Sequence, residues 1–137
     1  MTPEQVKLIR TSFDAMWPVR DDIAALCYGR FFELAPDARA LFKTTDMVRQ
    51  RGKLMDMIAA LVGSLDQNAI FQSIVTNSGR HHARFGVRPA QYDALGEALV
   101  WSIERKLGSS FTPDMLASWR VLYDRVQTDM QKAAAQA

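Results

Sequence analysis

Residues 78–87, Ser78-Gly79-Arg80-His81-His82-Ala83-Arg84-Phe85-Gly86-Val87, hold both histidines of the chain. Imidazole is the only side chain whose ordinary pKa lies between pH 5 and 8, so imidazole chemistry at neutral pH is confined to this segment. The segment also has the pattern of a helix end, because Gly86 is suited to a left-handed terminator. Which histidine faces the protein interior therefore decides both how this helix packs and what it can bind.

Helical spacing separates the two histidines. The residues three, four, seven, eight and eleven places before His82 form an apolar stripe with two small members: Gly79, Ser78, Val75, Ile74 and Phe71. The same offsets from His81 give Ser78, Asn77, Ile74, Ser73 and Ile70. His82 is therefore expected to face inward, with His81 at the edge. The small residues are expected to leave room for a flat group over the His82 ring, although a hydrogen-bonded core histidine is the commoner reason for an inward imidazole.

The rest of the chain shows helical periodicity and no long apolar–polar alternation. Thr2-Pro3 and Thr112-Pro113 are cap-then-proline starts, and Pro18, Gly86 and Gly108 are stops. The pattern predicts one all-α domain, residues 1–137, with six to eight helices of unequal length and a frayed tail at residues 132–137. The expected helices cover about residues 3–17, 21–34, 36–42, 47–65, 69–84, 89–107 and 113–130.

Composition limits the class of protein. The chain has 137 residues, 48% of them hydrophobic, and its 17 basic and 15 acidic side chains leave a net charge of +2. That balance does not favour nucleic-acid or membrane binding. No apolar run is long enough for a membrane span, no secretory signal is evident, and the lone Cys27 is expected to be a buried thiol. We expect a cytoplasmic protein.

Several kinds of site are disfavoured by the residues present. One cysteine and two adjacent histidines do not make a four-ligand zinc site, and no nucleophile motif or glycine-rich phosphate loop occurs. A haem iron needs only one protein ligand, because the porphyrin supplies four nitrogens. The wall opposite His82 would then carry a few polar groups, for which Gln50 and Tyr28 are candidates, with Phe42 nearby. Each also has an alternative without function: Gln50 as a surface residue, and Tyr28 and Phe42 as core aromatics.

Taken in order, these residues resemble the globin family, in particular the bacterial single-domain globins and the globin domain of flavohaemoglobins. The resemblance runs from about Thr2 to Met130. It rests on an ordered set of motifs: Tyr28; Pro36 followed by Phe42; Gln50 and Leu54; Gly79-Arg80-His81-His82; Phe85-Gly86-Val87; and Pro89-Ala90-Gln91-Tyr92. It implies the globin fold, a three-on-three sandwich of helices around a haem pocket.

The resemblance also assigns roles. It implies a haem b whose iron is ligated by His82, and a distal pair, Tyr28 and Gln50, that faces bound O2, NO or CO. Leu54 would pack over the gas and Phe42 against the porphyrin. Lys53 or Arg84 would meet the haem propionates, and Phe85, Val87 and Tyr92 would line the cofactor. Since both histidines lie on one helix, a histidine on each face of the haem is excluded.

Two departures from flavohaemoglobins are evident. No Rossmann-like reductase segment is present in this sequence. Where the resemblance implies a carboxylate on the last helix near the ligating histidine, this chain has Ala134. The histidine should then carry less anionic character, which weakens any push toward O–O cleavage.

Three classes of function follow from the residues and the resemblance. The first is reversible, high-affinity oxygen binding, in which the Tyr28 phenol stabilises the bound gas. The second is a nitric oxide dioxygenase that takes electrons from a separate reductase. The third is a gas sensor or a haem-free structural domain.

Overall fold

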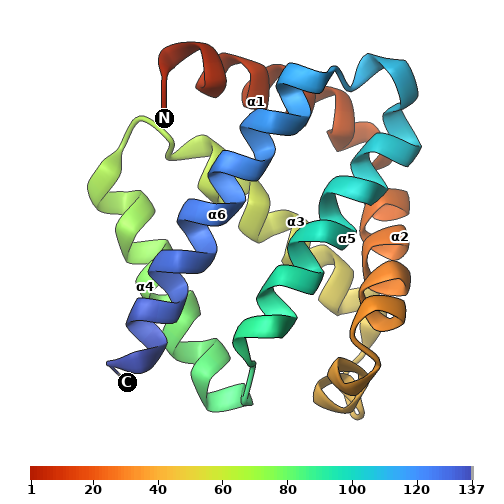
Figure 1. The fold of residues 1–137 in the computed structure, drawn as a ribbon, viewed down its shortest axis with the longest axis vertical. Coiled ribbons are helices and arrows are strands. Elements are labelled where there is room, and N and C mark those ends of the chain that lie inside the picture. Colours follow the sequence, from red (N-terminus) through yellow and green to blue (C-terminus); the bar gives the residue numbers. More distant parts are fainter. Residues whose placement is uncertain (137) are drawn as a thin grey trace.

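The computed structural model describes residues 1–136, which form six α-helices and three short 3-10 segments (Figure 1). No strand occurs in these residues, so the all-α prediction is confirmed. In chain order the elements are α1 (Pro3–Met16), η1 (Trp17–Val19), α2 (Arg20–Leu34), η2 (Pro36–Phe42), α3 (Met47–Gly63), α4 (Asn68–Phe85), α5 (Pro89–Leu107), η3 (Gly108–Ser110) and α6 (Pro113–Ala135).

The helices form two layers of three. One layer contains α2, α5 and α6; the other contains α1, α3 and α4. The principal contacts join α2 to α5, α4 to α6, α1 to α6 and α2 to α3. In Figure 1, α3 passes behind α5 and α6, and the end of α4 meets the start of α5 at the lower edge of the molecule. This is the three-on-three sandwich expected from the sequence.

Local chemistry explains where the helices begin and end. Thr2 caps α1 through its hydroxyl, which accepts the Gln5 N–H at 3.1 Å, and Gln5 Oε1 accepts the Thr2 N–H at 2.9 Å. Asp46 caps α3 by accepting the Val48 N–H at 3.1 Å. Gly86 ends α4 with φ +81°, in the left-handed region that glycine tolerates best.

The C-terminal helix continues further than the sequence indicates. Residues 132–135, expected to belong to a frayed tail, are the last residues of α6. Ala133 is buried in this last turn, so the turn packs on the rest of the protein instead of extending into solvent. Ala137 lies outside the described residues.

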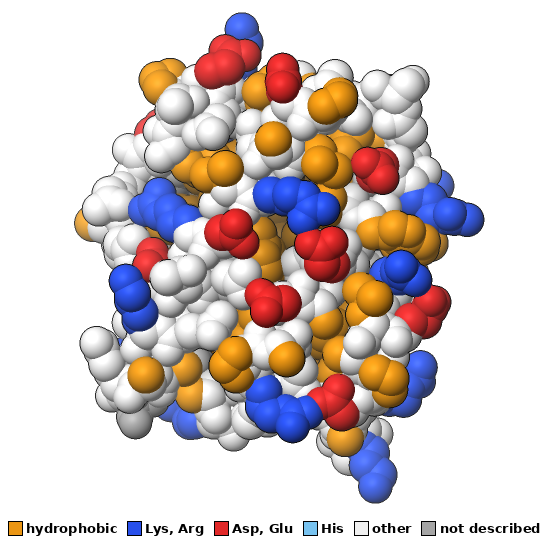
Figure 2. Space-filling view, in the orientation of Figure 1, with side chains coloured by type: hydrophobic (Ala, Val, Ile, Leu, Met, Phe, Trp, Pro, Cys, Tyr) orange, Lys and Arg blue, Asp and Glu red, His pale blue; other side chains and the backbone are white. Residues whose placement is uncertain are grey.

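Charges of both signs are mixed over the face seen in Figure 2, with apolar side chains between them. That face therefore lacks the single-sign field of a nucleic-acid site. Within residues 1–136, no helix combines the length and the apolar character that crossing a membrane requires.

Candidate functional site

His82 lies in the last turn of α4, on the face that packs into the protein. The same face buries Phe71, Val75, Ser78 and Gly79. His82 is half-buried whereas His81 is exposed, as the helical spacing predicts. The left-handed Gly86 ends the helix one turn later, so His82 is held at the end of a rigid element.

The environment of His82 favours a neutral imidazole. Burial, and secondarily the neighbouring His81, lowers the pKa of His82 below its ordinary value of 6.5. The Tyr92 hydroxyl lies 3.4 Å from His82 Nδ1. A neutral imidazole whose Nδ1 faces a hydroxyl can hold its proton on that nitrogen, which leaves the Nε2 lone pair for a ligand bond.

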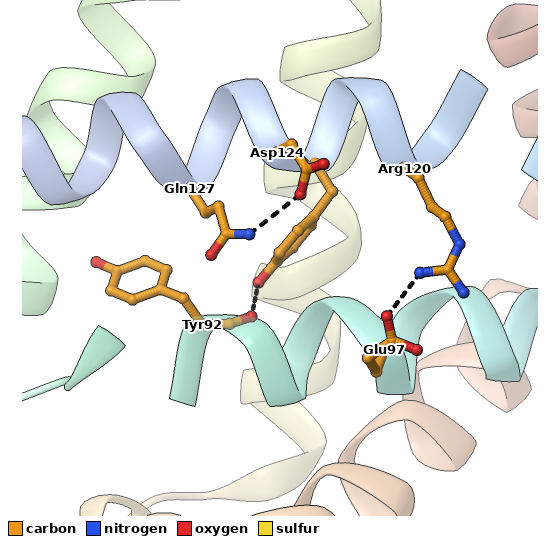
Figure 3. Close-up of polar contacts among 6 residues, drawn as sticks. Tyr92, Glu97, Arg120, Asp124 and Gln127 are labelled. Carbon is orange, nitrogen blue, oxygen red and sulfur yellow. Dashed lines mark hydrogen bonds and ion pairs between the residues drawn. The ribbon is translucent and has the colours of Figure 1, made fainter. Parts of the chain in front are cut away.

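Tyr92 is positioned from α6. It lies in the first turn of α5, where its backbone oxygen accepts a hydrogen bond from the Tyr123 hydroxyl at 2.5 Å (Figure 3). The Tyr123 ring crosses α5 at Gly96, where any side chain would overlap the ring. Burial raises the pKa of the Tyr123 phenol far above its ordinary value, so it stays protonated and keeps donating. The backbone of Tyr92 is therefore held in place, and this fixes the position from which its hydroxyl reaches His82.

A second polar pair lies on the wall formed by α2 and α3. Gln50 Nε2 donates to the Tyr28 hydroxyl oxygen at 3.1 Å. Burial raises the pKa of Tyr28 to about 12, an effect that the Gln50 contact partly opposes, so the phenol is neutral near pH 7. Because Tyr28 accepts from Gln50, its own hydroxyl hydrogen is available for another acceptor.

Phenylalanines surround this polar pair. The Tyr28 ring centroid lies 5.6 Å from that of Phe42 and 6.1 Å from that of Phe32, with Phe31 at 6.4 Å. Phe42 comes from η2 and is half-buried, and Leu54 of α3 is half-buried one turn after Gln50. A phenol and an amide are thus set in an otherwise apolar wall, an arrangement typical of a small-ligand pocket.

None of the remaining candidates from the sequence makes a side-chain hydrogen bond to these two pairs in residues 1–136, although the Val87 N–H donates to the His82 backbone oxygen at 3.1 Å. Lys53 and Arg84 are exposed, and Val87 is half-buried against the core. Phe85 is 52% exposed, and its ring centroid lies 5.0 Å from that of His81. The structure therefore brings Tyr28, Gln50 and Phe42 together in one group and His82 and Tyr92 in another. Phe85 instead packs beside the exposed His81.

The expectation that small residues leave room over the His82 ring is wrong for Gly79. A Cβ added to Gly79 would overlap the backbone of Met130 on α6. Gly79 is small because α4 and α6 cross there in close contact, and the space is filled by α6. It does not keep room over the His82 ring.

Sequence reasoning missed a polar junction between the two walls. Gln91, next to Tyr92, is only 4% exposed, and its Oε1 accepts the Arg88 N–H at 2.8 Å. Its Nε2 donates to Asp37 Oδ2 of η2 at 3.2 Å, and the Arg88 guanidinium pairs with the same carboxylate. The two contacts with Asp37 span more than 50 positions, so no local pattern indicated them.

Protein side chains alone offer little to a metal ion. Across residues 1–136, no group of three or more His, Cys, Asp or Glu side chains lies close enough to hold one. Any metal bound at His82 would need its other ligands from a cofactor.

Comparisons with known proteins agree with this architecture. The family model described as Globin matches residues 25–130. The neuroglobin of Tetraodon nigroviridis is 26% identical over 148 residues, which cover 98% of this chain and 93% of that protein. The neuroglobin of Chaenocephalus aceratus is 25% identical over the same shares of the two chains. The flavohemoprotein of Bacillus subtilis is 25% identical over 120 residues, covering 86% of this chain but only 30% of the flavohemoprotein.

Proposed function

The chain belongs to the globin family, whose members bind gases reversibly at a haem, and on this basis we propose that His82 ligates the haem iron in this protein. The observation that carries the assignment is the half-buried, neutral imidazole whose Nδ1 faces the Tyr92 hydroxyl at 3.4 Å. A ligand set of one nitrogen is what a haem iron takes from a globin, because the porphyrin occupies four positions.

The residues present fit a haem. The donor chemistry is suitable, since the described residues include no competing cluster of ligands and His82 is neutral. The surrounding walls are also suitable, because partly buried apolar side chains pack against the core on both sides: Phe42, Met47, Leu54, Met57, Ile74 and Val87. These side chains match the apolar faces of a porphyrin. Lys53 and Arg84 are exposed basic groups that we assign to the propionates.

On the His82 side, the proton of the neutral imidazole has a defined position. With Nε2 as the ligand nitrogen, Nδ1 carries the proton and donates to the Tyr92 oxygen. Ligation through Nε2 would leave the proton on Nδ1, and the hydrogen bond to Tyr92 then restricts rotation of the ring. Tyr123 in turn restrains Tyr92 through its backbone oxygen.

On the opposite wall, the protein offers a donor to the gas. When bound, haem b supplies a ferrous iron that takes a small gas such as O2, NO or CO. Tyr28 donates its free hydroxyl hydrogen to that gas, while Gln50 Nε2 holds the phenol oxygen in place. The phenylalanines around Tyr28 keep water away, which strengthens the hydrogen bond.

We assign reversible oxygen binding in preference to nitric oxide dioxygenation with a separate reductase. The same distal pair serves both reactions, but the proximal side favours binding. Ala134, half-buried on α6, offers no carboxylate, and the hydrogen bond of the Tyr92 hydroxyl is to His82. A weakly polarised histidine ligand favours reversible binding of O2 over cleavage of the O–O bond.

Absorption spectra of the haem-titrated protein, oxidised, reduced and with CO, test this function. We expect His82→Ala to abolish or severely weaken haem retention and His81→Ala, the matched control, to leave it nearly unchanged. A protein without a haem band, or a reversed order of the two variants, would overturn the assignment. The dioxygenase is distinguished by rapid NO consumption by the oxygenated protein when a cellular reductase is supplied.

A further inference from the structure

One carboxylate joins η2, on one side of the candidate site, to the start of α5 on the other. Asp37 lies in η2, five residues before Phe42, and its Oδ2 accepts from Gln91 Nε2 at 3.2 Å. The same oxygen pairs with the Arg88 guanidinium. Both partners belong to the start of α5, which carries Tyr92. We call Asp37, Arg88 and Gln91 the clasp.

The clasp has the features of a built junction and not of a chance surface pair. Gln91 is 4% exposed, and both ends of its amide are used: Nε2 by Asp37 and Oε1 by the Arg88 N–H at 2.8 Å. A buried amide that loses its partner leaves a polar group unsatisfied, so this geometry is more costly to break than an exposed ion pair. Asp37 itself is about half exposed, at 49%.

The position of the clasp connects it to the site. On one side, η2 carries Phe42, whose ring packs on Tyr28 at 5.6 Å. On the other side, Gln91 is followed directly by Tyr92, whose hydroxyl meets His82. Apart from the clasp, no hydrogen bond or ion pair found in residues 1–136 joins η2 to α5, although α2 packs extensively on α5 and Asp22 of α2 pairs with Lys106 of α5 at 3.0 Å. The distance between η2 and the start of α5 therefore depends on Asp37.

We infer that Asp37 is a positioning residue, which holds η2 against the first turn of α5 and thereby keeps the haem site at its working width. This inference rests on the proposed function where it concerns haem retention. The part of the inference that concerns the spacing of η2 and α5 is independent of the proposed function, because this spacing is a property of the chain with or without haem.

The spacing is measured with nitroxide labels at A40C on η2 and A90C on α5, both exposed positions. The native Cys27 is fully buried and stays unlabelled in the folded protein. We expect D37A to broaden the label–label distance distribution and move it to longer distances in the haem-free protein. An unchanged distribution would overturn the inference, whether or not the protein binds haem.

Haem retention is measured as the rate of haem transfer to excess apomyoglobin. We expect D37A to raise this rate about 3- to 10-fold, the effect of losing one net hydrogen bond. D37N keeps an oxygen for Gln91 and should fall between D37A and the native protein. A D37N rate equal to that of D37A would contradict the role of the Gln91 contact.

Glu97→Ala is the matched control. Glu97 also lies on α5 and pairs with an arginine, Arg120, at 2.6 Å, with 58% of its side chain exposed (Figure 3). No hydrogen bond or ion pair found in residues 1–136 joins it to η2. We expect E97A to change neither the label distances nor the transfer rate. Transfer rates that rise equally in D37A and E97A would show a general loss of stability and overturn the inference. Absence of haem binding in the native protein would instead refute the proposed function and leave the label distances to decide on the clasp.

Discussion

Replacing Tyr28 with phenylalanine tests the distal side of the site with a single atom. The substitution removes the hydroxyl oxygen and keeps the ring, whose contacts with Phe31, Phe32 and Phe42 fill the wall. Two hydrogen bonds are lost. One is the contact from Gln50 Nε2 at 3.1 Å, and the other is the bond that we propose to the gas.

The two losses have different sizes. The Gln50 contact joins neutral groups, and Gln50 is half-buried, so its loss should cost about 1 kcal/mol of folding free energy. The bond to O2 is charge-assisted and worth about 1.5–3 kcal/mol. Oxygen should therefore dissociate about 10- to 100-fold faster from the variant.

Oxygen dissociation from the haem-loaded protein is measured by stopped flow, with CO present to trap the vacated site. Ser12→Ala is the control, because Ser12 accepts a hydrogen bond from Trp119 Nε1 at 2.7 Å in another part of the core. It should lower stability without changing oxygen dissociation. If Tyr28→Phe leaves the dissociation rate unchanged, the phenol does not donate to the gas and our interpretation of the pair is wrong.

Two further predictions concern packing and pH. Gly79→Ala should destabilise the protein by about 1–3 kcal/mol in urea unfolding, because its Cβ overlaps the Met130 backbone. Gly52→Ala, which meets open space on α3, should not, and equal losses would contradict the close crossing. Burial raises the pKa of Cys27 from 9.0 to about 12 and that of Tyr28 from 10.0 to about 12. Both groups lose their protons more readily in the unfolded chain, so the free energy of unfolding should fall as the pH rises above 9. For Cys27 the fall should reach about 1.4 kcal/mol per pH unit. A free energy of unfolding that stays unchanged up to pH 11 would refute this.

Elements of the fold that depend on neighbours in sequence were predictable. The caps at Thr2 and Thr112, the stop at Gly86 and the inward face of His82 follow from spacing, and the structure agrees with each. The end of α6 was not predictable, because Ala133 is buried by packing that an alanine-rich sequence does not reveal.

The site divides in the same way. The motifs that resemble a globin identified Tyr28 with Gln50 and His82 with Tyr92, and the structure pairs each set. The reason for Gly79 was missed, because its neighbour lies on another helix. The clasp was missed for the same reason: its acidic and basic members lie far apart along the chain, and each reads locally as an ordinary surface charge.

The crossing of Tyr123 over Gly96 has a consequence for how this sequence can change. The ring occupies the space that any side chain at position 96 would need, so substitutions at positions 96 and 123 are expected to depend on each other. A larger residue at 96 requires the ring at 123 to move or to become smaller, and either change disturbs the hydroxyl that restrains Tyr92. A substitution at either position is therefore expected to loosen Tyr92, and through it the contact with His82.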